Sequence, residues 1–234
     1  MLTSHPAIEK GLLTLIKIKN LTKAYGSKTV FDRLNMNIEK HKVNFLMGEN
    51  GAGKTTLLKC LLGLEPFKGD ILYDDKPLGA VRHKVHVVYD DSPFYLNLTG
   101  YQNISILLNK RVGKEELEQA ATKFLGHALL KKKVKTYSYG QRKKLSFIIA
   151  VLNKPEYLLL DEISNGLDYR SMMELQDIVK SWSNEMTIVA AGHQFEFYSS
   201  IVDRLFVLKN GSALHVEYFK TNGAGLGDVY KEYL

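Results

Sequence analysis

Short runs of apolar residues, many of them β-branched or aromatic, recur along the chain and predict β-strands. Between them lie stretches whose apolar positions follow helical spacing, and this alternation favours an α/β fold. The Asn210-Gly211 pair, between two apolar runs, predicts a tight hairpin that closes a late antiparallel pair. The predicted strands lie at residues 15–18, 30–38, 43–47, 71–73, 85–89, 157–160, 187–190 and 205–208.

The middle of the chain, between residues 89 and 157, shows no strand pattern. Helical lengths and apolar spacings occur instead at residues 101–109, 114–124 and 141–152. We therefore expect a separate helical subdomain inserted in the middle of the fold.

The chain has the length of one compact domain, 1–234, and 45% of its residues are hydrophobic, enough for a sizeable core. We expect residues 1–89 and 154–234 to build that core and residues 90–153 to form the helical subdomain. Residues 1–10 are expected to be a short extension.

A glycine-rich segment follows the predicted strand at 43–47 and precedes a helical run. It matches the pattern G-x-x-x-x-G-K-[ST], whose glycines let the backbone curl until its N–H groups converge on phosphate oxygens. Lys54 can then reach the β and γ phosphates of a nucleotide, and the Thr55 hydroxyl can ligate Mg²⁺. The flanking strand and helix argue against the alternative of a glycine-rich turn with an incidental lysine. The predicted nucleotide-binding residues are Gly48, Asn50, Gly51, Ala52, Gly53, Lys54, Thr55 and Thr56.

The apolar run at residues 157–160 leads into two carboxylates, Asp161 and Glu162. A buried strand delivers its last residues to the carboxyl edge of the sheet, where ligands of open α/β folds bind. Asp161 can hold Mg²⁺, directly or through water, and Glu162 can act as general base toward an attacking water. An Asp-Glu pair after a strand is most often only a strand end, but its combination with the phosphate loop favours the catalytic interpretation.

Further segments make the sequence resemble the ABC ATPases from about residue 16 to residue 230. Residues 137–141, Tyr-Ser-Tyr-Gly-Gln, resemble the family signature Leu-Ser-Gly-Gly-Gln, and residues 164–168, Ser-Asn-Gly-Leu-Asp, resemble the D-loop. His193 looks like the switch histidine, Tyr25 like the adenine-stacking aromatic, and Asp90 stands at the position of the Q-loop glutamine. The resemblance implies a P-loop NTPase (RecA-like) core, an antiparallel β subdomain and an inserted α-helical signature subdomain.

The predicted helix that begins near Ser138 and Gly140 offers a second anion site, because the first N–H groups of a helix have no partner within it. One nucleotide cannot occupy both this site and the phosphate loop of the same chain. A two-fold pair, in which the signature of each chain caps the γ-phosphate held by the other, resolves the difficulty, and the resemblance implies the same arrangement. We therefore expect an ATPase dimer, of identical or related chains, with ATP at the interface. The resemblance also adds Gln141 and Asp168 to the residues that face the nucleotide.

Three positions depart from the family pattern: Asp90, Tyr139, and Tyr137, which replaces a leucine and keeps an apolar body. A carboxylate at Asp90 about 5 Å from the γ-phosphate would cost about 3 kcal/mol per unit charge at an effective dielectric near 20. Asp90 therefore fits there only as a ligand of an intervening Mg²⁺, or with its side chain turned away, and Asp91 makes the register uncertain by one residue. Tyr139, in place of a glycine, is accommodated if its ring points outward.

The net charge of +7 does not by itself select a partner, and the densest basic stretch, residues 131–135, lacks the aromatic residues of a nucleic-acid surface. Cys60 is the single cysteine, which excludes a disulfide framework, and no apolar run has the ~18 residues of a membrane span.

Three functions remain open from the sequence. The first is the ATP-hydrolysing subunit of a transporter at the cytoplasmic face of the membrane, acting through a separate transmembrane permease subunit. Residues 91–100 resemble the corresponding stretch of export-type ATPases of the ABC-2 class, which favours export. The second is a soluble ABC ATPase in iron-sulfur assembly or nucleic-acid metabolism, although no sustained heptad or second cassette supports it and we expect no nucleic acid as partner. The third, a small-molecule kinase, does not need the signature.

Overall fold

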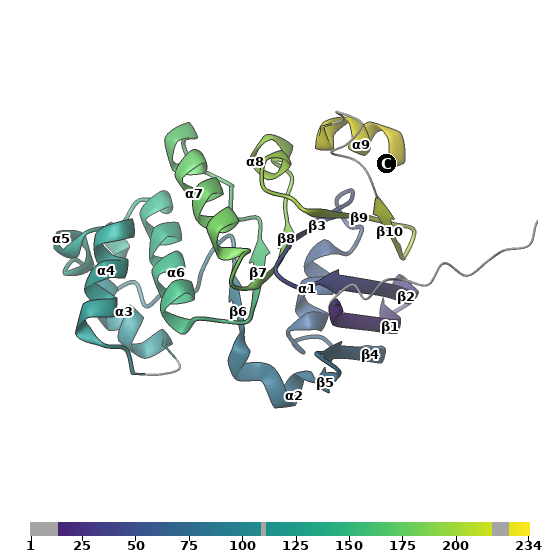
Figure 1. Ribbon diagram of the computed structural model, residues 1–234, viewed down its shortest axis with the longest axis horizontal. Coiled ribbons are helices and arrows are strands. Elements are labelled where there is room, and N and C mark those ends of the chain that lie inside the picture. Colours follow the sequence, from purple (N-terminus) through teal and green to yellow (C-terminus); the bar gives the residue numbers. More distant parts are fainter. Residues whose placement is uncertain (1–13, 109–110, 217–224) are drawn as a thin grey trace, which may run out of the picture.

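The computed structural model describes residues 14–108, 111–216 and 225–234. The extension expected at residues 1–10 and the last residue of the helix predicted at 101–109 lie outside these ranges. The elements form three groups: a central six-stranded sheet, an antiparallel four-stranded sheet on one side and a group of helices on the other (Figure 1).

The central sheet has the strand order β10-β9-β3-β8-β7-β6. Its strands are β3 (Val43–Met47), β6 (Val85–Val88), β7 (Tyr157–Asp161), β8 (Thr187–Ala191), β9 (Arg204–Lys209) and β10 (Ser212–Val216). All neighbours are parallel except β10, which turns back on β9 through the predicted Asn210-Gly211 hairpin. Because the other five strands run in one direction, the residues that follow β3, β6, β7 and β8 meet at one edge of the sheet.

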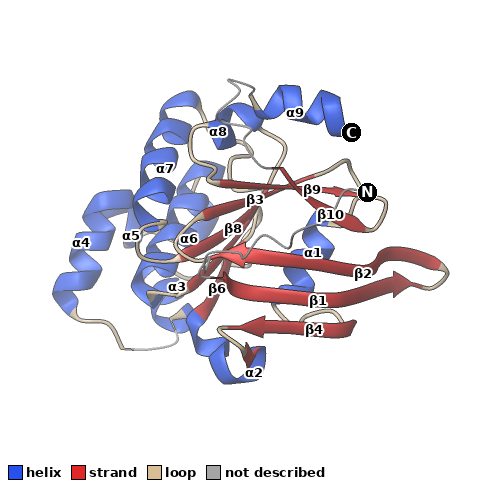
Figure 2. Ribbon diagram, turned by 45° about the vertical axis from the view of Figure 1, so that its right-hand side comes forward, coloured by secondary structure: helices blue, strands red, loops and turns tan. Residues whose placement is uncertain are grey.

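The second sheet has the order β2-β1-β4-β5 and is antiparallel throughout. Its strands are β1 (Thr14–Tyr25), β2 (Lys28–Glu39), β4 (Lys68–Tyr73) and β5 (Lys76–Pro77). The strand predicted at residues 15–18 is longer than expected, because register irregularities let β1 follow β2 as far as Tyr25. Helix α1 (Lys54–Leu61) lies between the two sheets (Figure 2), where Leu57 shares a core with Phe31 of β2 and Leu159 of β7.

The helices between β6 and β7 lie together at one end of the molecule (Figure 1). They are α3 (Gly100–Leu107), α4 (Lys114–Phe124), α5 (His127–Leu130), the short 3-10 helix η2 (Val134–Thr136) and α6 (Tyr139–Asn153). The predicted helical stretches are thus confirmed as helices. Leu145 and Ile148 of α6 are fully buried in the core that also contains Leu160 of β7, so α6 joins this group to the central sheet.

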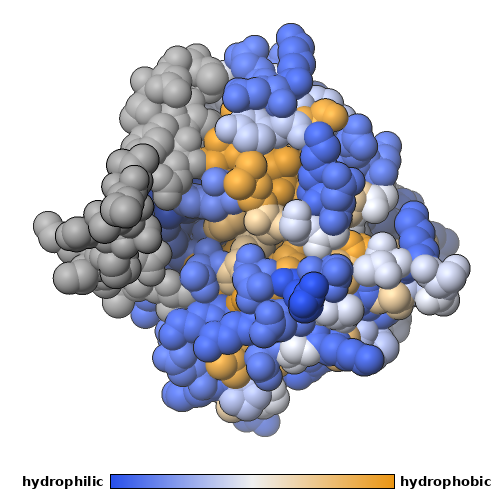
Figure 3. Space-filling view, turned by 90° about the vertical axis from the view of Figure 1, so that its right-hand side faces the viewer, coloured by the Kyte–Doolittle hydropathy of each residue, from blue (hydrophilic) through white to orange (hydrophobic). Residues whose placement is uncertain are grey.

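The remaining helices are α2 (Leu78–Val81), the 3-10 helix η1 (Arg82–Lys84), α7 (Tyr169–Trp182), α8 (Phe195–Ser199) and α9 (Leu226–Tyr233). The last three cover the face of the central sheet opposite α1, where Val179 and Phe197 are buried. On the side at the right of Figure 1, hydrophilic residues surround a small hydrophobic area (Figure 3). Within the described ranges, no helix has both the length and the apolar character of a membrane span.

Candidate functional site

The loop between β3 and α1 curls at two glycines with left-handed backbone angles. Gly51 has φ 86° and Gly53 has φ 102°, values that side chains other than hydrogen rarely permit. A Cβ atom on Gly53 would also lie only 2.6 Å from Cζ of Phe31. The loop can therefore take this shape only with glycine at position 53. Helix α1 begins at the next residue, Lys54.

Lys54 lies folded back into this loop and is 7% exposed. Its ammonium donates hydrogen bonds to the carbonyl oxygens of Gly48, at 2.8 Å, and Glu49, at 3.1 Å. Burial lowers the pKa of Lys54, while the nearby charges of Glu162 and Asp161 oppose that shift. Since an ammonium has three N–H donors, one remains for an anion placed in the loop.

The hydroxyl of Thr55 and the carboxylate of Asp161 lie side by side, with Oγ1 of Thr55 donating to Oδ1 of Asp161 at 3.4 Å. Asp161 is 9% exposed, and burial, followed by the charge of Glu162, raises the pKa of its carboxyl. A divalent cation would relieve this accumulation of buried negative charge, and hydroxyl and carboxylate oxygens are ligands that Mg²⁺ accepts. These two residues therefore fit the predicted metal.

Glu162 adopts a left-handed backbone conformation, φ 52°, directly after β7, while its N–H donates to the carbonyl of Ala191 at 2.9 Å. Such a conformation is unfavourable for a residue with a side chain and is common at functional sites. Oε1 of its carboxylate lies 3.4 Å from Nε2 of His193. The other oxygen, Oε2, is buried and has no hydrogen-bond partner among the described residues. The carboxylate thus keeps one oxygen free to accept a proton from a water, and the imidazole of His193 lies beside it.

These groups surround a cavity of about 360 Å³ whose lining comprises Tyr25, Lys28, Val30, Asn50, Gly51, Gly53, Lys54, Thr55, Thr56, Glu162 and His193. Nine of these eleven residues were predicted from the sequence. Lys28 and Val30 were not, although Lys28 pairs with Tyr25 across the β1–β2 turn, so a lysine three residues after a predicted stacking aromatic is a usable signal. Tyr25 is 46% exposed, and the ammonium of Lys23 lies 4.3 Å from the centroid of its ring, so a base would stack on the opposite face.

The signature residues lie elsewhere. Ser138 caps α6 and forms a reciprocal pair with Gln141: the Gln141 N–H donates to Ser138 Oγ at 3.2 Å, and the Ser138 N–H donates to Gln141 Oε1 at 2.9 Å. Asp168 caps α7 by a single bond, in which its carboxylate accepts the N–H of Ser171 at 2.8 Å. In the described part of the chain, neither these residues nor Gly140 line the cavity. Their predicted contacts with a nucleotide would therefore require a nucleotide held by another chain.

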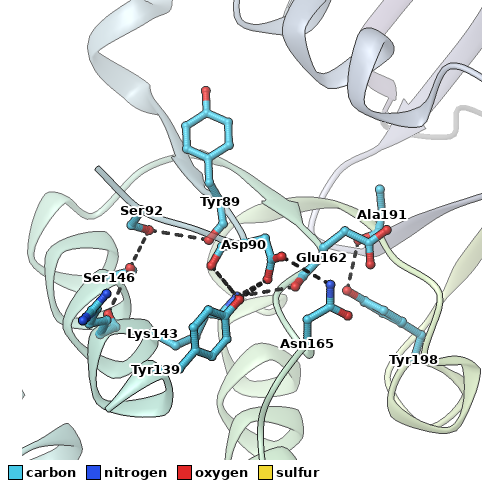
Figure 4. Close-up of polar contacts among 11 residues, drawn as sticks. Tyr89, Asp90, Ser92, Tyr139, Lys143, Ser146, Glu162, Asn165, Ala191 and Tyr198 are labelled. Carbon is cyan, nitrogen blue, oxygen red and sulfur yellow. Dashed lines mark hydrogen bonds and ion pairs between the residues drawn. The ribbon is translucent and has the colours of Figure 1, made fainter. Parts of the chain in front are cut away.

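Asp90 lies in a network of polar contacts shown in Figure 4. Its carboxylate accepts hydrogen bonds from the hydroxyl of Tyr139, from the ammonium of Lys143 at 2.9 Å and from Nδ2 of Asn165 at 3.4 Å. The Tyr139 ring is 38% exposed, as its expected outward orientation requires, but it also packs over Gly166, where an added Cβ would lie 2.8 Å from it. Sequence reasoning missed Lys143, although a lysine on the apolar face of a helix signals a buried counter-charge.

Three comparisons place this geometry in a family. Residues 31–165 match the family model described as ABC transporter. The lantibiotic transport ATP-binding protein SrtF of Streptococcus pyogenes is 33% identical over 209 residues, which cover 87% of this chain and 91% of that protein. YhcH of Bacillus subtilis (strain 168), an uncharacterised ABC transporter ATP-binding protein, is 30% identical over 93% of this chain and 74% of its own length.

Solved structures share the fold. The structure of the ATP-binding subunit of an ABC transporter superposes with a TM-score of 0.83 over 94% of this chain and 99% of its own, at 22% identity. CbiO1 of Clostridium perfringens, part of the ABC transporter complex cbiONQ, gives a TM-score of 0.78 at 24% identity and covers 94% of both chains. One conclusion explains the glycine loop, the paired carboxylates and the separate signature helix. This chain belongs to the ABC transporter family, as an ATP-binding subunit.

Proposed function

We propose that the chain hydrolyses ATP, with Glu162 as general base, His193 orienting the water and Lys54 holding the β and γ phosphates. The observation that carries this proposal is the cavity itself, which Lys54 after β3 and Glu162 after β7 both line at the same edge of the central sheet. Tyr25 would stack on the adenine and residues 48–56 would enclose the phosphates.

Thr55 and Asp161 would hold Mg²⁺ in this site. The ion would supply charge neutralisation between the phosphates and the buried carboxylates. Thr55 would contribute its hydroxyl oxygen and Asp161 its Oδ1, the two atoms that already lie 3.4 Å apart.

Hydrolysis would require two ATPase chains, either two copies of this chain or this chain and a related one. The supporting observation is that the capping pair of Ser138 and Gln141 uses the serine oxygen as acceptor and leaves its proton free to donate. This hydroxyl and the first N–H groups of α6 would bind the γ-phosphate held by the partner chain, with Asp168 and Gly140 at the same interface.

The pair would sit at the cytoplasmic face of the cell membrane and drive transport, most simply export, through a separate transmembrane permease subunit. The name of SrtF, a lantibiotic transport ATP-binding protein, supports a transporter, and CbiO1 is a part of a multi-subunit complex. Tagged chain from solubilised membranes is expected to carry a polytopic membrane protein with it. Purification without any such protein from intact membranes would contradict the proposed partner.

The decisive variant is Glu162→Gln, which removes the base and leaves the phosphate loop intact. We expect ATP hydrolysis to fall by about 10²- to 10⁴-fold while ATP binding persists, so that chains accumulate as ATP-bound dimers in size-exclusion chromatography. Glu156→Gln is the matched control, because Glu156 stands just before β7 and pairs with Lys84 at the surface, at 2.6 Å. Turnover at the wild-type rate in Glu162→Gln would remove this residue from the role of base.

A further inference from the structure

Lys143 is a buried cation on the signature helix α6, and the proposed function gives it no role. Its side chain is 1% exposed, although it lies only one turn from the start of α6. The ammonium donates to the main-chain carbonyl of Asp90 at 2.9 Å, to Oδ1 of Asp90 at 2.9 Å and to the main-chain carbonyl of Glu162 at 3.4 Å (Figure 4). All three of its N–H donors therefore have acceptors.

Asp90 supplies the opposite charge that this burial requires, because an ammonium removed from water without a counter-charge is strongly destabilising. Burial lowers the pKa of Lys143, and the hydrogen bond to Asp90 opposes that change. Burial also acts to raise the pKa of Asp90, but the Tyr139 hydroxyl and then Lys143 hold it below its ordinary value. Asp90 is therefore engaged as a carboxylate, and both of its oxygens accept hydrogen bonds from this chain.

The same helix has a second link to the segment after β6. Oγ of Ser146, three residues beyond Lys143, donates to Oγ of Ser92 at 2.7 Å. With the Tyr139 hydroxyl on Asp90, three side chains of one helix face hold residues 90–92. The segment after β6 is thus bonded to the start of the signature helix at several points. The hydrogen bond from Lys143 to the carbonyl of Glu162 links both to the residue after β7.

Lys143 contacts the main chain of Glu162, where the backbone conformation is strained. The left-handed φ of 52° at Glu162 is unfavourable, and its carbonyl is held by Lys143 and by the N–H of Asn165 at 3.3 Å. Asn165 in turn donates from Nδ2 to Asp90. Two residues therefore hold the carbonyl of Glu162: Lys143 of the signature helix and Asn165 of the loop after β7. Both also donate to the carboxylate of Asp90.

We propose that Lys143 is a positioning residue for the catalytic carboxylate: its buried ammonium ties the signature helix to the carbonyl of Glu162, and Asp90 serves as its counter-charge rather than as a ligand of Mg²⁺. The inference rests on the proposed hydrolysis by Glu162. A displacement of about 1 Å at a reacting group can reduce a rate by about 10²-fold, so a residue that touches no nucleotide can govern turnover through this bond.

The test uses Lys143→Gln, Asp90→Asn and the double variant in the chain purified with its partners. In Lys143→Gln, kcat for ATP is expected to fall by about 10- to 100-fold, while KM stays within about threefold because Lys143 lies outside the cavity lining. In Asp90→Asn, the melting temperature should fall by about 5 °C, because the ammonium loses its counter-charge. The double variant should recover at least about half of that loss, since neither charge is left alone.

Mg²⁺ titration separates the two roles of Asp90. Half-saturating Mg²⁺ for turnover is expected to stay within about twofold of wild type in Asp90→Asn, whereas loss of a metal ligand would raise it by about tenfold or more. The matched control is the pair Lys144→Gln and Glu174→Gln, because Lys144 is the next residue on α6 and its ion pair with Glu174, at 3.0 Å, is partly exposed. Both control variants should match wild type in melting temperature and kcat.

Amide hydrogen exchange gives a measurement that does not need hydrolysis. Without nucleotide, the peptide spanning residues 162–168 should exchange faster in Lys143→Gln than in wild type, and in the control variants it should not. A tenfold shift in the Mg²⁺ requirement of Asp90→Asn, additive melting temperatures in the double variant, or unchanged kcat and exchange in Lys143→Gln would each overturn the proposal. If the wild-type assembly hydrolysed no ATP, the proposed function would fail, while exchange and melting would still decide whether Lys143 holds Glu162.

Discussion

Substitution of Lys54 by methionine tests the phosphate loop most directly, because the side chain stays unbranched, is shorter by one atom only, and loses its charge and donors. An ammonium and a phosphate oxygen about 4 Å apart attract each other by about 4 kcal/mol at an effective dielectric near 20. Water entering the cavity, and water solvating the freed carbonyls of Gly48 and Glu49, will replace part of that attraction. We therefore expect a loss of about 2–3 kcal/mol in binding, which raises the Kd for ATP by about 30- to 150-fold.

The assay is isothermal titration calorimetry with Mg-ATP, in the Glu162→Gln background so that no nucleotide is consumed. Lys59→Met is the matched control: Lys59 lies further along α1 and outside the cavity lining. It should bind ATP as the parent does. A Kd for Lys54→Met within about threefold of the parent, in a variant with an unchanged melting temperature, would refute the assignment of this loop.

Three further outcomes follow from single contacts. Gly53→Ala should lower the melting temperature by about 5–15 °C in differential scanning fluorimetry, because a Cβ at φ 102° is strained and would press on Phe31; an unchanged melting temperature would contradict the loop geometry. His193→Ala should reduce ATP turnover by about 10²-fold with little change in ATP affinity, and unaltered turnover would show that its contact with the carboxylate is incidental. Asp168→Ala should destabilise the chain at neutral pH, because the N–H of Ser171 holds the pKa of Asp168 below its ordinary value of 3.8. That stabilisation is present above the ordinary pKa and lost as pH falls through the lowered one, so the melting difference from wild type should vanish in strong acid.

The sequence predicted those strands whose own residue pattern matches their surroundings in the folded chain. The inner strands β3, β7 and β8 are short apolar runs because both of their faces are covered, and such runs are visible without a structure. The length of β1 was not visible, because its extension to Tyr25 depends on irregular pairing with β2 and not on alternation in its own residues.

The site likewise has parts that the sequence predicts and parts that it does not. The phosphate loop and the two carboxylates could be predicted, since each is a contiguous motif whose flanking elements fix its place at the sheet edge. The partner of Asp90 could not, because Lys143 lies 53 positions away in sequence and only packing of α6 against the core brings the two together. The contact of the Tyr139 hydroxyl with Asp90 could not be predicted for the same reason.

The left-handed backbone at Glu162 has a consequence for how this protein can change. Asparagine and glycine tolerate that conformation far better than glutamate, so either replacement should make the chain harder to melt while abolishing turnover. In a lineage that no longer used Glu162, selection for stability alone would favour replacement of this glutamate. A glutamate at this strained position is therefore what the proposed hydrolysis would require.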